Sequence, residues 1–238
     1  MAVSLPTGTE EMEKDSNGQI AGVSEKSEEM LDTLLSHYVA GSLPMPVNTM
    51  VEAHLEMRPD SRFIVRGMET VAADQMEEFD PAPLANRDKI FNSIIGSDAP
   101  EALQLKPSGD RCPIFPKSLQ DFTGFRAGEV PWKTKLPGFK EFSLGEWDGC
   151  EAELLWIRAG RAMPAHTHGG SELTLVLNGG FSDVEGHYIR GDIAAADESV
   201  DHRPIADPDE TCICLAITTA PLKLTGSMTQ LFSDIFGR

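Results

Sequence analysis

Residues 160–179 read GRAMPAHTHGGSELTLVLNG, and this stretch decides the fold of the second half of the chain. His166 and His168 are two positions apart, so a β-strand would place both imidazoles on one face. Glu172 follows a Gly-Gly turn, and the alternating leucines after it are typical of a second strand. Imidazole and carboxylate groups brought together across a hairpin are transition-metal ligands. The stretch therefore predicts a hairpin that carries a metal site.

A fourth ligand is expected from a neighbouring strand, and His202 is the better candidate. It follows a Gly191-Asp192 turn, whereas His187 lies beside a predicted turn at Gly186 and is expected to face solvent. One ligand set predicts one transition metal per chain. Zinc is the first choice, with iron, manganese or nickel as alternatives.

The spacing G-x5-H-x-H-x3-E-x6-G matches the first motif of cupins at all five fixed positions, and Gly191-Asp192 resembles part of the second motif. From Cys112 onward the apolar residues recur with period two between Gly, Pro and Asp turns, which favours an antiparallel β-barrel or jelly roll. The predicted strands cover residues 119–127, 139–144, 150–158, 172–178, 181–189, 193–196 and 212–218.

The first half of the chain has a helical pattern. Apolar residues recur at helical spacing in 27–39, after Pro44 and Pro46, after Pro59, and again after Asn86. The fold class is therefore α+β, with a small helical domain before the cupin. The predicted divisions are a disordered tail 1–26, a helical domain 27–96, a linker 97–111, a cupin domain 112–225 and a C-terminal segment 226–238.

Composition excludes several classes of partner. The 238 residues carry a formal net charge of -18, which makes direct binding of DNA, RNA or an anionic membrane surface a poor interpretation. No apolar run approaches the roughly 20 residues of a membrane helix. The N-terminus has neither a basic region nor an apolar core of a secretory signal, so we expect a cytoplasmic protein.

Four cysteines are present, and two of them form a Cys212-Ile-Cys214 pattern that would place both sulfurs on one strand face. Two interpretations stay open. The favoured one is a pair of small buried core residues, and the other is a redox-responsive pair near the metal.

The whole pattern resembles the ChrR family of anti-sigma factors. The resemblance is densest around the histidine hairpin, Gly191-Asp192, His202 and the strand that begins at Cys212, and it extends weakly to the first helix. It implies a cupin zinc site formed by His166, His168, Glu172 and His202. It also implies an N-terminal helical domain that binds a sigma factor of the extracytoplasmic-function (ECF) class and releases it under oxidative or singlet-oxygen stress.

The helical half departs from that family. The family's helical domain uses a histidine before the first helix and then H-x3-C-x2-C to bind zinc. The corresponding residues here are Glu29, His54, Arg58 and Ser61, so only His54 matches. A structural zinc needs closed nitrogen and sulfur coordination, so we expect this half to lack zinc, with His54 as a weak candidate ligand.

Two functions remain in competition. The first is a regulator that uses the apolar faces of its first two helices to bind a sigma factor, with Leu31, Leu35, Met50 and Val51 as candidate contacts. The second is a metal-dependent cupin enzyme of dioxygenase or lyase type with a vestigial helical domain. An enzyme needs an open coordination position, which would discriminate the two. Both functions are compatible with a homodimer that forms through the cupin.

Overall fold

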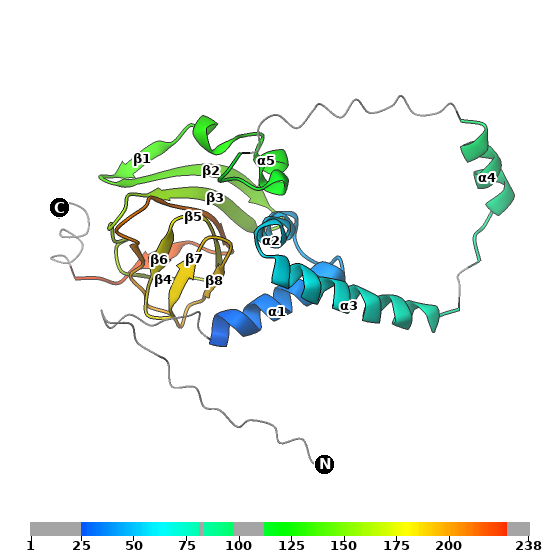
Figure 1. The fold of residues 1–238 in the computed structure, drawn as a ribbon, viewed down its shortest axis with the longest axis horizontal. Helices are drawn as coiled ribbons and strands as arrows, with labels where there is room; N and C mark the ends of the chain where they lie inside the picture. The colour runs from blue at the N-terminus through cyan, green and yellow to red at the C-terminus, as the bar shows by residue number, and fades with distance from the viewer. Residues whose placement is uncertain (1–24, 81–82, 98–111, 228–238) are drawn as a thin grey trace, which may run out of the picture.

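The fold is that of a computed structural model, which describes residues 25–80, 83–97 and 112–227 (Figure 1). Nearly all of the predicted tail, linker and C-terminal segment therefore lie outside the described residues. Five α-helices are described, with a single 3-10 turn, Ala127–Glu129, after the last of them. The helices are α1 (Glu25–Val39), α2 (Met45–Met57), α3 (Pro59–Glu77), α4 (Arg87–Ile95) and α5 (Lys117–Thr123).

The strands follow in the second half and form the antiparallel jelly roll of a cupin, as predicted. Within the described residues the hydrogen bonds do not close a barrel. They form a six-stranded sheet in the order β1-β2-β3-β10-β5-β8, a three-stranded sheet β7-β6-β9 and a pair β11-β4. The bounds are β1 (Lys133–Leu136), β2 (Phe139–Trp147), β3 (Cys150–Ile157), β4 (His166–His168), β5 (Glu172–Asn178), β6 (Gly180–Ser182), β7 (His187–Ile189), β8 (Ile193–Ala196), β9 (Ile205–Ala206), β10 (Cys212–Thr218) and β11 (Leu222–Leu224).

Two predicted strands are wrong. Residues 119–127 were expected to be extended, but Lys117–Thr123 is helix α5. Pro116 precedes the helix and Gly124 ends it in the left-handed conformation, with φ of 73°, which is a common way to begin and stop a helix. Residues 181–189 were expected to be one strand, but they contain the β6–β7 hairpin.

Strand β10 lies inside the six-stranded sheet and is buried on both faces, which explains its continuous apolar run. Along that strand the side chains alternate between two cores. Leu215 and Ile217 lie in the core that the sheet shares with the helices. Cys214 and Ala216 lie in the core inside the jelly roll, together with Phe181 of the smaller sheet.

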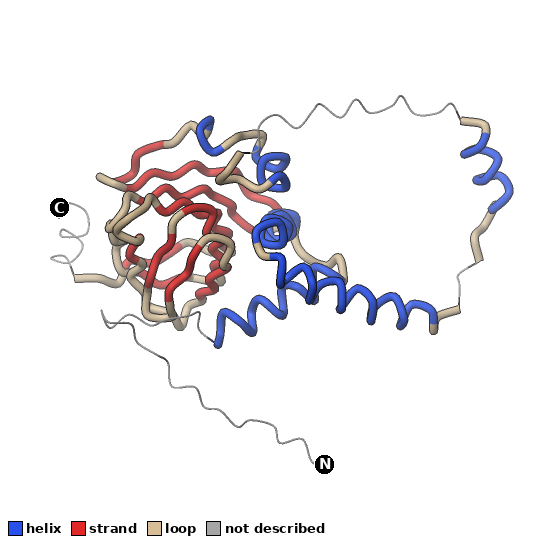
Figure 2. The backbone as a smooth tube through the Cα atoms, in the orientation of Figure 1, coloured by secondary structure: helices blue, strands red, loops and turns tan. Residues whose placement is uncertain are grey.

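The helices α1, α2 and α5 lie along one side of the strands, as Figure 2 shows. Leu35, Met50 and Val51 are fully buried there, and Leu31 is partly buried. The expectation that these residues contact a partner protein is therefore wrong for the first three. Their apolar stripes are used to bind the sheet, because the helices and the strands share one hydrophobic core.

Helix α4 has a different environment. None of its residues is buried, and Figure 1 draws it apart from the other elements. Four large apolar side chains on it are exposed, namely Ile90, Phe91, Ile94 and Ile95. No helix among the described residues combines the length and the apolar character that crossing a bilayer requires.

Candidate metal centre

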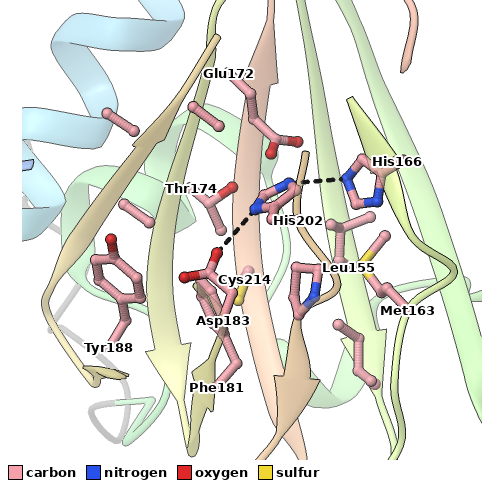
Figure 3. A pocket seen from close by; sticks show the side chains of 15 residues that line it. Leu155, Met163, His166, Glu172, Thr174, Phe181, Asp183, Tyr188, His202 and Cys214 are labelled. Atoms are coloured by element: carbon pink, nitrogen blue, oxygen red, sulfur yellow. Dashed lines mark hydrogen bonds and ion pairs between the residues drawn. The ribbon is translucent and has the colours of Figure 1, made fainter. Parts of the chain in front are cut away.

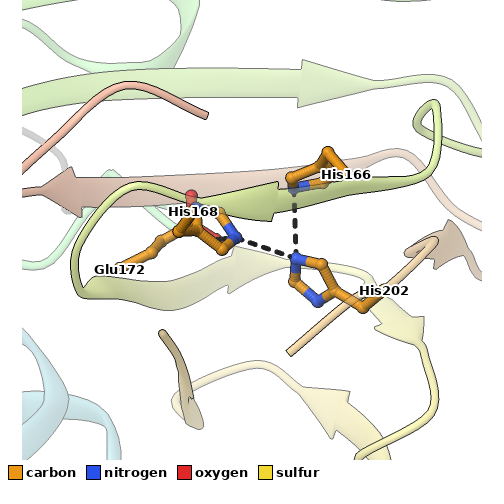
Figure 4. Close-up of side chains that lie close together, drawn as sticks. All are labelled: His166, His168, Glu172 and His202. Atoms are coloured by element: carbon orange, nitrogen blue, oxygen red, sulfur yellow. Dashed lines mark hydrogen bonds and ion pairs between the residues drawn. The ribbon is translucent and has the colours of Figure 1, made fainter. Parts of the chain in front are cut away.

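Three elements bring the four predicted ligands together. His166 and His168 are the ends of β4, and Glu172 is the first residue of β5 (Figure 4). His202 arrives from a different part of the chain and forms an isolated antiparallel bridge with His166. The two residues exchange both backbone N–H···O bonds, each 3.0 Å long. The main chain therefore fixes His202 opposite the hairpin.

The side-chain atoms converge on one point. Nε2 of His202 lies 3.1 Å from Nε2 of His166 and 3.1 Å from Nε2 of His168. Nε2 of His168 lies 3.4 Å from Oε2 of Glu172. One nitrogen or oxygen from each residue falls within 4.8 Å of all the others, and the three histidines are buried. Among the described residues this is the one such group of histidine, cysteine and acidic side chains.

The other nitrogen of two rings fixes the tautomer. Nδ1 of His202 lies 2.8 Å from a carboxylate oxygen of Asp183, and Nδ1 of His166 lies 2.8 Å from the carbonyl oxygen of Pro164. The Pro164 carbonyl and an ionised Asp183 carboxyl are acceptors, so each Nδ1 carries a proton. In the neutral form of each ring, Nε2 then carries a lone pair. The two Nε2 atoms that face each other at 3.1 Å are therefore both acceptors.

Two lone pairs at this distance repel each other, and a cation that both nitrogens bind would remove that repulsion. A metal ion is such a cation, and an imidazole that donates its other N–H to a carboxylate is the usual arrangement around a metal. The donor set of three imidazoles and one carboxylate thus fits a transition metal. No other described histidine, cysteine or acidic side chain belongs to this group.

Burial favours the neutral forms of His166, His168 and Glu172. It lowers the pKa of His168 to about 4, with the neighbouring imidazoles adding to the shift, and it lowers the pKa of His166. Burial also raises the pKa of Glu172 to about 7. Neutral imidazoles are the form that binds metal, so protons compete weakly for the nitrogens near neutral pH.

The sequence did not point to Asp183. It lies in the turn between β6 and β7, and its side chain is only 3% exposed although it is charged. The one sequence signal is an aspartate three positions before Gly186 in a short turn, where its other oxygen accepts the N–H of Glu185. Nothing in that spacing indicates a partnership with His202, nineteen positions away.

The candidate metal centre borders two cavities. Figure 3 shows the first, inside the jelly roll, where Glu172, His202 and Cys214 line the wall together with Thr174. The second has a volume of about 280 Å³, and His166 and Glu172 line it as well. Its wall is mostly apolar, with side chains such as Phe139, Leu136, Met163, Leu222 and Leu224.

The structure also places the four remaining cysteine and histidine candidates. Cys212 and Cys214 are buried on the inner face of β10, with their sulfurs 3.4 Å apart. The contact with Cys212 and burial both raise the pKa of the Cys214 thiol. His187 is partly exposed and pairs with Asp207, away from the centre. His54 is buried between α2 and the cupin, with both ring nitrogens in hydrogen bonds.

A jelly roll with converged histidines and a carboxylate, covered on its outer face by a helical layer, defines a two-part cupin protein with a candidate metal centre. Residues 121–221 match the family model of the ChrR cupin-like domain. The chain is 34% identical over 205 residues to the anti-sigma-E factor ChrR of Cereibacter sphaeroides, a match that spans 86% of this chain and 95% of that protein. The chain belongs to the ChrR family of anti-sigma factors.

A solved structure agrees over both parts of the molecule. A chain in the crystal structure of Rhodobacter sphaeroides SigE in complex with the anti-sigma ChrR superposes with a TM-score of 0.66, at 34% identity. The superposition covers 79% of this chain and 96% of that one. Similarity therefore extends through the helical layer as well as the cupin.

Proposed function

We propose that this protein sequesters a sigma factor of the ECF class in the cytoplasm and that its cupin metal centre controls the release of that sigma factor. The relatives named above support a sigma factor as the partner. The observation that carries the proposal is a set of exposed apolar side chains on α3, on α4 and on the segment between them, which no described part of the chain covers.

These side chains fall within residues 63–95. They include aromatic and aliphatic groups that a folded monomer normally buries or scatters. The exposed members are Phe63, Ile64, Val71, Met76, Phe79, Leu84, Ile90, Phe91, Ile94 and Ile95. Exposed apolar groups in this number on helices are typical of a protein interface. The net charge of -18 adds long-range attraction toward a partner with basic nucleic-acid-binding faces.

Helix α4 allows a clean test, because none of its residues supports the fold. We expect Ile94→Asp to weaken the complex with the ECF sigma factor by about 2 kcal/mol or more, as at interface hot spots. Asn92→Asp is the matched control, since it places the same charge at an exposed polar position of the same helix. The measurement is binding of purified full-length protein to each ECF sigma factor of the source organism, with circular dichroism of each variant.

Equal affinity of Ile94→Asp and Asn92→Asp for a partner that binds would show that the α4 surface is not the interface. Failure of the unsubstituted protein to bind any of these sigma factors would contradict the function itself.

We infer that the centre holds one zinc ion, bound by His166, His168, Glu172 and His202. Four ligands from the protein would close a tetrahedral site, which suits a structural or sensing role. Asp183 and the Pro164 carbonyl would hold two of the rings in the orientation that presents Nε2. Oxidative or singlet-oxygen stress as the signal for release, and Cys212 with Cys214 as redox groups, remain predictions from the family and the sequence.

A metal-dependent cupin enzyme is the second candidate, and the 280 Å³ cavity beside His166 and Glu172 favours it. The cavity is large enough for a small apolar substrate that would reach the metal. The two functions differ in the metal's coordination. Four protein ligands in the X-ray absorption spectrum of the metal-loaded protein support the regulator, whereas an exchangeable water ligand supports the enzyme. A homodimer through the cupin is compatible with both, and sedimentation of the loaded protein tests it.

A further inference from the structure

The positions that correspond to zinc ligands in the family's helical domain form a different kind of site in this chain. His54 lies near the end of α2, Arg58 joins α2 to α3, and Ser61 lies in the first turn of α3. These side chains do not fit a zinc ion. A guanidinium and a hydroxyl replace the thiolates that structural zinc requires, and Glu29 is exposed on α1.

His54 links the two helices to the cupin. Its Nδ1 lies 2.6 Å from the carbonyl oxygen of Gly191, which can only accept, so Nδ1 carries the proton. Its Nε2 lies 2.8 Å from Oγ of Ser61, which donates its hydroxyl proton to the remaining lone pair. The imidazole is 2% exposed and fully used in these two bonds.

Arg58 reaches the same turn of the cupin. Its Nη2 donates to Oδ1 of Asp192 at 2.6 Å, and the two groups form a partly exposed ion pair. The aliphatic part of Arg58 lies across the α-carbon of Gly191, where a Cβ would come within 2.8 Å of Nε and 3.1 Å of Cγ. Gly191 has φ of +95° in addition, so this turn combines a backbone and a packing requirement for glycine.

The turn that receives these contacts is itself rigid. Oδ2 of Asp192 accepts the N–H of Ile189 at 2.9 Å, which closes the turn between β7 and β8. Gly191 and Asp192 also exchange backbone bonds with Val176 of β5. A rigid surface with an outward carbonyl and a carboxylate therefore faces a donor imidazole and a guanidinium on the helical layer. The two surfaces are complementary in hydrogen bonding and in charge.

We propose that His54, Arg58 and Ser61 are a metal-free docking site for the Gly191-Asp192 turn, so that the cupin holds the α2–α3 corner in the place where relatives use zinc. The corner needs a crosslink because α2 and α3 meet at Arg58 with no side-chain cap on α3. The bonds to Gly191 and Asp192 supply that crosslink from outside the helical layer. This inference is independent of the sigma factor, since it concerns contacts within one chain.

The test uses the full-length, metal-loaded protein and amide hydrogen exchange of α2 and α3. We expect Arg58→Ala and Asp192→Ala each to raise the exchange rate at the α2–α3 corner by about tenfold, as local opening becomes easier. The double variant should exchange no faster than the faster single variant, because Asp192→Ala already removes the ion pair that Arg58→Ala removes. Arg62→Ala is the matched control, since Arg62 is an exposed arginine of α3 outside the site.

A charge swap keeps the test informative if the single variants fold poorly. Arg58→Asp with Asp192→Arg should restore part of the protection that either change alone removes. Additive effects of the two alanine substitutions, or equal effects of Arg62→Ala and Arg58→Ala, would overturn the proposal. A second tightly bound zinc that is lost in His54→Ala would also overturn it.

Discussion

The cupin centre and the His54 site both hold buried imidazoles, yet the two sites differ in what faces the Nε2 atoms. At the centre, Nδ1 of His166 and of His202 donate to oxygens, and their Nε2 lone pairs face each other. At His54 one ring nitrogen donates to Gly191 and the other accepts from Ser61, so no lone pair remains. A buried imidazole nitrogen whose lone pair has no hydrogen-bond donor can bind a metal, whereas the lone pair of His54 is already used by Ser61.

The largest expected effect breaks the centre itself. We expect His166→Ala with His168→Ala to lower the bound metal from about one ion per chain to nearly none, because half of the ligands are lost. His187→Ala is the control, since that histidine pairs with Asp207 outside the centre. Elemental analysis of the purified proteins measures the ratio. A full complement of metal in the double variant would refute the assignment of the site.

A smaller effect tests the tautomer. Asp183→Asn removes the charge that holds Nδ1–H of His202, so we expect metal affinity to fall by about 10- to 100-fold. Asp207→Asn is the matched control, because Asp207 has the same contact with His187 and does not touch the centre. Competition with a chromophoric chelator measures both affinities. Equal losses in the two variants would show that the effect is not specific to the centre.

The smallest effect concerns pH at the helical site. Burial lowers the pKa of His54, and the Arg58 charge adds to this, although the Gly191 carbonyl and Asp192 act in the opposite direction. In the unfolded chain His54 takes up a proton near pH 6.5, whereas in the folded protein it does so only at lower pH. The stabilisation by His54 is therefore complete above pH 6.5 and declines below it, by at most about 1.4 kcal/mol per pH unit.

Urea unfolding of the wild type and of His54→Asn at pH 8 and pH 5.5 isolates this contribution. The wild type should lose more stability between the two pH values than the variant does, since the cupin histidines titrate equally in both. An identical pH dependence would mean that His54 does not remain neutral in the folded protein.

The sequence predicts which side chains converge in the cupin, because the information it needs is mostly local. The period-two spacing of His166 and His168 and the turn before Glu172 are enough to assemble three ligands, and the structure brings His202 to them. Asp183 could not be predicted, because its partner is set by how two loops meet in space. The same holds for Arg58. It stands at a position where the family has a zinc-binding cysteine, but it pairs with Asp192, which is 134 positions away.

For the helices, the sequence predicts a buried face but not its packing partner. The apolar stripes of α1 and α2 were predicted correctly as stripes, but their partner was not, because periodicity shows that a face is buried and not what buries it. The error at Lys117–Thr123 has another cause. Pro116 and Gly124 are ordinary signals for the start and end of a helix, and the period-two interpretation passed over them.

Strand β10 has a consequence for how such proteins can change over time. Its outward residues, Ile213, Leu215 and Ile217, belong to the core under the helices, and its inward residues face the interior beside the metal centre. The two hydrophobic cores therefore share this strand. Replacing the helical layer with that of a relative should also require replacing the outward side chains of β10. Recombination between family members should therefore preserve the fold only at junctions that keep β10 together with the elements that pack on its two faces.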